Sequence, residues 1–257
     1  MTLTEVLILT FLAALATDLA TGLGVIPLFF VHDMSRRVAG VLTAIAAGMM
    51  VSASVMMFVA GRAADGGALG SVLLGGVVGA VFFALASRWV KNHETFDIAG
   101  LRESGGVGAL LVVAAMTIHS LPEGIAVGVS FGTVEQTHSI AFGLLMSAAI
   151  AVHNIPEGLA IGLALRPKGI SPWKCVGWAI FSSLPQPLAA VPAAWAVWLF
   201  QPLLPGAMGF AAGAMVWLVL SELAPECAKQ AGTWRSAVGA AVGFAVMWGM
   251  TAALGQL

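Results

Sequence analysis

Two motifs, 34 residues apart, contain the side chains of this chain that could bind a metal ion. The first runs from His119 to Gly128 and the second from His153 to Gly162, and both read H-x-x-P-E-G-x-A-x-G. In each motif the histidine and the glutamate are four residues apart, so on a helix they share one face, about one turn apart. Imidazole nitrogen and carboxylate oxygen are ligands that zinc and other divalent first-row metals accept. Two glutamates would also balance the charge of one divalent cation.

The residues around each histidine–glutamate pair favour a functional site over a packing pattern. Pro122 and Pro156 remove a backbone donor, and the carbonyl that this frees is tolerated in a membrane only inside protein or beside a wet cavity. The glycines that follow allow another helix to approach closely. The repeated spacing therefore predicts a metal site formed by four side chains: His119, Glu123, His153 and Glu157. A structural or proton-relay role for the histidines is the alternative interpretation.

The composition indicates what kind of protein must position these side chains. Of 257 residues 60% are hydrophobic and only 9% are charged, whereas an ordinary soluble domain has about 25% charged residues. Twelve acidic and eleven basic residues leave no basic excess for nucleic acid, and two cysteines cannot form a disulfide scaffold. These counts exclude a soluble enzyme, a disordered chain and a nucleic-acid binder. They predict a polytopic membrane protein whose surroundings are the lipid bilayer.

Apolar runs long enough to cross a bilayer occur eight times along the chain. A membrane-spanning helix needs about 20 predominantly apolar residues, and continuous runs without strict alternation favour helices over a barrel. The sequence thus predicts an all-α integral membrane protein with a single transmembrane domain over 1–257. The expected helices are at about 4–30, 39–60, 68–90, 105–131, 139–165, 174–200, 206–226 and 236–255.

The basic residues indicate how these helices are oriented. With eight spans, ten of the eleven lysines and arginines fall on one side of the membrane, and Arg62 alone falls on the other. Because positive charges concentrate in cytoplasmic loops, both chain ends are expected outside.

Acidic residues within or near the spans are candidates for a metal pathway. Lysine and arginine occur in the expected spans only at their ends, as Arg88 and Lys174, so these acids have no protein cation deeper in the membrane. A charge at the bilayer centre is costly, and each such residue is a functional hypothesis. Beyond the two motifs, Asp18 in the first span and Glu222 and Glu226 at the cytoplasmic end of the seventh are the possible pathway residues.

The double motif resembles that of the ZIP family of divalent metal transporters, particularly its bacterial members. Further stretches at 20–30, 46–54 and 211–226 resemble the first, second and seventh helices of that family. The resemblance implies a 3+2+3 arrangement of eight helices, a homodimer, and a primary site in which Met50 joins the four ligands of the motifs. Met49 adjoins Met50, and either could instead fill the core.

The sequence departs from the resemblance at the second metal site of two-metal relatives. The corresponding positions here are Ser120, Asn154 and Gln186, and none of them supplies a carboxylate. A second divalent ion close to the first would meet repulsion without added negative charge. We therefore expect one well-occupied metal ion and a weak or empty second site.

Together these observations predict a transporter and not an enzyme, with no cofactor. It would import divalent metal into the cytoplasm through a midplane site by alternating access. Zinc is favoured as the metal, and cadmium, iron, manganese and cobalt also suit the ligands. The expected location is the plasma membrane, in a bacterium the inner membrane. An intramembrane metalloenzyme is one alternative, although its usual H-E-x-x-H motif is absent, and a metal-gated proton pathway is another.

Overall fold

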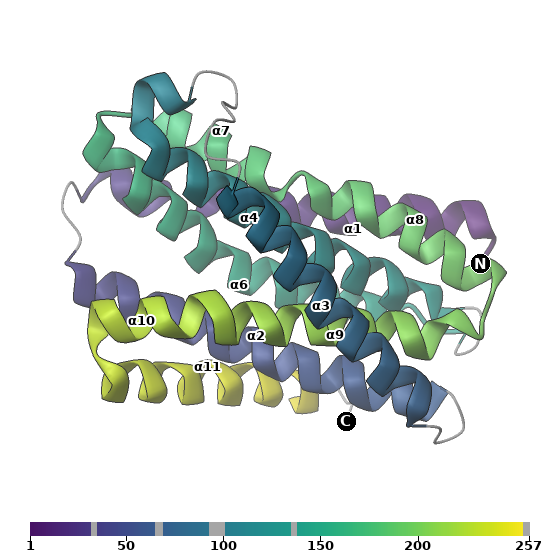
Figure 1. The fold of residues 1–257 in the computed structure, drawn as a ribbon. Coiled ribbons are helices and arrows are strands. Elements are labelled where there is room, and N and C mark those ends of the chain that lie inside the picture. Colours follow the sequence, from purple (N-terminus) through teal and green to yellow (C-terminus); the bar gives the residue numbers. More distant parts are fainter. Residues whose placement is uncertain (32–34, 65–68, 93–100, 135–137, 254–257) are drawn as a thin grey trace.

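The computed structural model describes residues 1–31, 35–64, 69–92, 101–134 and 138–253. Every regular element within these residues is helical, so the all-α prediction is confirmed (Figure 1). The main helices are α1 (Leu3–Leu23), α2 (Arg36–Ala64), α3 (Gly70–Asn92), α4 (Leu101–Gly132), α6 (Ala141–Leu165), α7 (Pro172–Ser183), α8 (Pro185–Leu199), α9 (Leu203–Leu218), α10 (Ala224–Ala231) and α11 (Thr233–Ala253). Shorter segments are the 3-10 turns η1 (Ile26–Phe29) and η2 (Arg166–Lys168) and the π-helical η3 (Val219–Leu223).

Much of the described chain is long and apolar enough to cross a membrane. Six such segments are Leu3–Phe29, Arg36–Ala63, Gly70–Trp89, Ala141–Leu165, Leu203–Ala231 and Thr233–Ala253. The 32-residue α4 and the pair α7–α8 complete a set of eight rods in the described chain. Large apolar side chains such as Leu74, Leu188 and Trp173 remain exposed on the outside. An exposed apolar surface of this extent suits contact with lipid.

Two of the expected spans are interrupted by proline. The span expected at 174–200 divides into α7 and α8 at Leu184, because Pro185 has no N–H with which to continue the helix. The span expected at 206–226 contains η3, where Ala224 N–H bonds the carbonyl of Val219, and Pro225 follows directly. A π-helical segment of this kind often marks a functional position.

The helices pack in four close parallel pairs that form two halves. In the first half, which we call the site half, α1 packs on α6 and α4 on α8, with α7 beside them. In the second, the support half, α2 packs on α11 and α3 on α9, with α10 beside α2.

Glycines bring the helices of each pair into backbone contact. A Cβ atom on Gly79 of α3 would lie 2.0 Å from the carbonyl oxygen of Phe210 in α9, and one on Gly243 of α11 would lie 1.9 Å from that of Ile45 in α2. Each described glycine that touches another helix does so within its own half. Only glycine permits such an approach, so each half is internally close-packed.

Side chains, by contrast, fill the contact between the halves. There α2 packs on α6 and α4 on α9. The apolar cluster that spans both halves includes Met50 and Met57 of α2, Met146 of α6 and Met215 of α9. Methionine is unbranched and flexible, so this contact is softer than the glycine contacts inside each half.

Candidate metal centre

The two motifs meet in the middle of the site half. Glu123 of α4 and His153 and Glu157 of α6 are almost fully buried, and one potential ligand atom from each lies within 4.8 Å of the others. Among the described residues, no lysine or arginine forms an ion pair with this cluster. Two buried carboxylates close together need a positive partner or a proton.

The geometry of the cluster suits a metal ion with nitrogen and oxygen ligands. His153 Nε2 lies 3.1 Å from Glu123 Oε1, at hydrogen-bond distance. Zinc binds such atoms at about 2.0–2.2 Å, so two ligands of a tetrahedral ion stand about 3.3 Å apart. Glu157 Oε1 and His153 Nδ1 have no hydrogen-bond partner among the described residues. Buried polar atoms without a partner are rare, and an ion or water that binds them is a usual reason.

The glycines of the motifs determine where the site helices lie. A Cβ atom on Gly124, directly after Glu123, would lie 2.4 Å from the carbonyl oxygen of Gln186 in α8. A Cβ atom on Gly158, directly after Glu157, would lie 1.7 Å from that of Thr21 in α1. The glycine of each P-E-G sequence therefore allows its helix to contact the backbone of a neighbouring helix. This contact determines where the main chain next to each glutamate lies.

His119 and Met50 are the two further predicted ligands. His119 is buried one turn before Glu123, but its nitrogens do not lie within 4.8 Å of all three ligand atoms. Its ring packs on Phe83 of α3, with ring centroids 5.3 Å apart, so it faces the support half. Met50 of α2 is fully buried in the apolar cluster that spans the halves. Of the four histidines and glutamates predicted as ligands, the structure thus brings three together.

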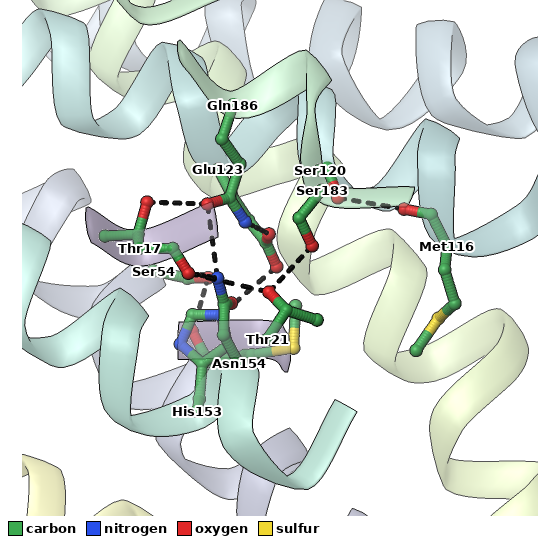
Figure 2. A network of polar contacts seen from close by, with 11 residues as sticks. Thr17, Thr21, Ser54, Met116, Ser120, Glu123, His153, Asn154, Ser183 and Gln186 are labelled. Atoms are coloured by element: carbon green, nitrogen blue, oxygen red, sulfur yellow. Dashed lines mark hydrogen bonds and ion pairs between the residues drawn. The ribbon is translucent and has the colours of Figure 1, made fainter. Parts of the chain in front are cut away.

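The amides of the predicted second site form a hydrogen-bonded network (Figure 2). Gln186 Nε2 donates to Glu123 Oε2 at 2.6 Å, and Gln186 Oε1 accepts from Asn154 Nδ2 at 3.1 Å and from Thr17 Oγ1 at 2.6 Å. Asn154 Nδ2 also donates to the carbonyl oxygen of Thr17 at 2.8 Å. Ser120 does not take part in these bonds, since its hydroxyl donates to the carbonyl of Met116 in its own helix.

Thr17, which the sequence motifs do not include, also belongs to this network through its hydroxyl and its carbonyl oxygen. Thr21, one turn later on α1, shares a 2.7 Å hydrogen bond with Ser183 at the end of α7. Threonines four residues apart lie on one face of a helix, so the spacing of Thr17 and Thr21 could have predicted a polar face on this largely apolar helix.

The predicted pathway acids are not among the three clustered ligands. Asp18 is buried in α1, and its Oδ1 has no hydrogen-bond partner among the described residues. Glu222 in η3 accepts a hydrogen bond of 2.5 Å from Ser87 of α3. Glu226 is exposed and accepts one of 2.8 Å from Gln230. Their role in a metal pathway stays a prediction.

Comparison with known proteins relates this architecture to one family. A family model described as ZIP zinc transporter matches residues 86–251, more than half of the chain. The zinc transporter GufA of Myxococcus xanthus is 34% identical over 252 residues, which cover 94% of this chain and 95% of that protein.

Two eukaryotic relatives are longer than the matched region. A putative zinc transporter of Arabidopsis thaliana is 39% identical over 236 residues, and the zinc transporter ZIP11 of Homo sapiens is 47% identical over 148 residues. The matches cover 92% and 56% of this chain but only 37% and 43% of those proteins. The chain thus spans less than half the length of these two relatives. On the family model and the nearly full-length bacterial match, the chain belongs to the ZIP zinc transporter family, a family of transporters and not of enzymes.

Proposed function

We propose that this chain carries divalent metal ions, zinc foremost, across a membrane and into the cytoplasm. The observation that carries the proposal is the buried cluster of Glu123, His153 and Glu157, which has two carboxylates and no lysine or arginine paired with it among the described residues. A divalent cation would neutralise these carboxylates and satisfy the unpaired atoms of Glu157 and His153. Relatives named as zinc transporters support zinc as the cargo.

Further ligands would complete the coordination when the metal binds. His119 lies one turn from Glu123 on the same helix, and Met50 belongs to the apolar cluster that spans the two halves. We infer that both join the metal after small adjustments. The coordination would then combine nitrogen, oxygen and one thioether, a set that suits borderline-soft metals.

Alternating access would arise from movement of one half against the other. Glycine–backbone contacts make each half a unit, whereas the contact between the halves consists of side chains and contains several methionines. The three clustered ligands all belong to the site half. Movement of this half past the other would therefore expose the same site to each side of the membrane in turn.

The proposed topology has eight membrane spans in a 3+2+3 arrangement with both chain ends outside. The start of α1 and the end of α11 lie at the same end of the bundle (Figure 1). Ten of the eleven basic residues would then face the cytoplasm, as the positive-inside rule requires. We place the protein in the plasma membrane, in a bacterium the inner membrane. We also propose a homodimer, which a mass measurement of the detergent-solubilised protein would test.

Metal uptake into proteoliposomes tests the proposed function. The purified protein is reconstituted with a zinc-sensitive dye inside the vesicles, and uptake is compared for wild type, Glu157→Gln and His153→Ala. Both variants remove one ligand from the cluster, so we expect initial uptake to fall by about 100-fold or more. Glu5→Gln is the matched control, because it neutralises an exposed carboxylate at the first turn of α1 and leaves the cluster intact.

The outcome separates this function from its rivals. Undiminished zinc uptake by folded Glu157→Gln and His153→Ala would refute the central site. Wild-type vesicles that pass protons but no zinc would indicate a metal-gated proton pathway instead.

A further inference from the structure

Gln186 is the one amide whose nitrogen touches a candidate metal ligand in the described hydrogen bonds. Its side chain is fully buried, and its Nε2 lies 2.6 Å from Glu123 Oε2. The other oxygen of the same carboxylate, Oε1, faces His153. Both oxygens of Glu123 therefore have protein partners, whereas Oε1 of Glu157 has none among the described residues. The two glutamates of the repeat are thus not equivalent.

Main-chain structure determines which way the Gln186 amide points. The carbonyl oxygen of Thr17 accepts from Asn154, so the nitrogen of the Asn154 amide must face α1 and Gln186. A carbonyl oxygen can only accept, and it would repel an Asn154 side chain turned the other way. Gln186 Oε1 must then face the Asn154 donor, and the Thr17 hydroxyl shares its one hydrogen between this oxygen and the carbonyl oxygen of Ala14. The Gln186 nitrogen consequently points at Glu123.

We propose that the Gln186 amide takes the place of a second cation beside Glu123 and thereby limits the centre to one metal ion. The proposal rests on the proposed metal site and deepens it. A hydrogen bond from an amide to a carboxylate is charge-assisted, so it supplies part of the stabilisation that a cation would give. Thr17 and Asn154 act as positioning residues, since they hold the amide in this orientation.

A second ion would have to displace this arrangement. It would need Glu123 Oε2, which the Gln186 nitrogen occupies, and Gln186 would have to turn its oxygen toward the ion. The turned nitrogen would then face the donor nitrogen of Asn154. Because the amides bring no negative charge, nothing would offset repulsion between two neighbouring divalent ions.

Metal stoichiometry of the purified full-length protein tests this proposal directly. The detergent-solubilised protein is dialysed to equilibrium against Zn²⁺ and the bound metal is counted by elemental analysis. We expect one ion per wild-type chain and two per Gln186→Glu chain, because the new carboxylate supplies the missing charge and an oxygen ligand. Gln201→Glu is the matched control, since it adds the same charge in the turn between α8 and α9, and it should bind one ion.

A second pair of variants tests the positioning residues. Thr17→Val keeps the shape of the side chain but removes the donor to Gln186, so Glu123 is held less firmly. We expect zinc affinity to fall by about tenfold, as when outer-shell partners of metal ligands are removed. Thr17→Ser retains the hydroxyl and should restore wild-type affinity, which a purely steric role for Thr17 would not produce.

The possible results support or overturn the proposal as follows. Two ions in the wild type would overturn it. One ion in the Gln186→Glu variant would also overturn it, provided that the variant has the same unfolding temperature as the wild type and is therefore folded. If Gln186→Glu does not fold, equal affinities of Thr17→Val and wild type would overturn it. A wild-type chain that binds no zinc would refute the metal site itself, and the proposal with it. One ion in wild type with wild-type affinity in Thr17→Ser, but not in Thr17→Val, would support it.

Discussion

The two halves of the molecule share one packing device but differ in what they enclose. Both bring parallel helices into contact through glycines, such as Gly128 against Ala190 in the site half and Gly213 against Gly76 in the support half. The site half encloses buried polar side chains that bond one another across α1, α4, α6 and α8. The support half encloses mainly alanine, methionine and other apolar side chains. Close packing thus serves to hold a polar site in one half and to build an apolar wall in the other.

Because the polar network lies in one half, few strong interactions cross the boundary between the halves. The described hydrogen bonds of the Gln186 network all lie within the site half, whereas the His119 ring contacts Phe83 across the boundary. A weak hydrogen bond of 3.6 Å from Ser130 to Met57 Sδ crosses the boundary. Such contacts are easily exchanged for others, so movement along the boundary would break few strong interactions.

The largest expected effect comes from linking the two halves covalently. In a background with Cys175 and Cys227 replaced by alanine, Met57→Cys with Ser130→Cys places two thiols across the boundary between α2 and α4, and a mass measurement checks that oxidation links them. Oxidation should reduce zinc uptake into proteoliposomes to background, and reduction should restore it, since the proposed alternating access requires the halves to move.

An adjacent residue of α2 provides the matched control for this cross-link. Met56 lies 3.1 Å from Thr251 of α11, so Met56→Cys with Thr251→Cys links α2 within its own half. This cross-link should leave uptake unchanged, because no movement is expected there. Undiminished uptake by the oxidised Met57–Ser130 pair would show that the halves do not move against each other.

A smaller but still large effect is expected when the glycine contacts are filled. Gly158→Ala in the site half and Gly243→Ala in the support half would place a Cβ atom 1.7 Å and 1.9 Å from a carbonyl oxygen. Because backbone cannot move aside as a side-chain end can, each should lose on the order of 3 kcal/mol of stability. Thermal unfolding of the purified variants in detergent measures the loss.

The controls for these substitutions are exposed glycines of the same two halves. Gly177 of α7 and Gly249 of α11 have nothing within 4 Å of a Cβ position. Alanine there should be neutral or stabilising, since it favours the helix. If Gly243→Ala unfolds like Gly249→Ala while Gly158→Ala is destabilised, close backbone packing matters only around the site, and the common device is refuted.

Patterns local in the chain made the helices and the repeat predictable from sequence. Apolar run length predicts a helical membrane protein, and the repeated spacing predicts that Glu123, His153 and Glu157 face one another. Pro185 marks a possible helix break, but the length and apolarity of 174–200 favoured one continuous span. The length and apolarity of 206–226 likewise predicted a continuous helix, so the π-helical segment before Pro225 was not predicted.

The network around Gln186 could not be predicted, because it depends on contacts between helices distant in the chain. Gln186 reaches Glu123 only because α8 lies on Gly124, and Thr17 reaches Gln186 across 169 residues. Sequence showed that the second-site positions lack carboxylates, but not that an amide donor would satisfy Glu123. It also placed Ser120 with the amides, although its hydroxyl bonds its own helix.

The smallest expected effect concerns Met50, the one proposed ligand that belongs to the support half. If its sulfur binds the metal, the sulfur–metal bond joins the site half to the support half. Under the proposed mechanism that bond must break during each transport cycle. A thioether is a weak, soft ligand, which would allow both binding and release. Met50→Leu keeps the buried volume and removes the sulfur, so it should weaken cadmium binding by roughly fivefold and leave manganese binding almost unchanged.

Met49→Leu is the control, as it alters the adjacent buried methionine. Equal cadmium affinity in both variants would make Met50 a packing residue, and the metal would then be bound by the site half alone, with no ligand to release when the halves move.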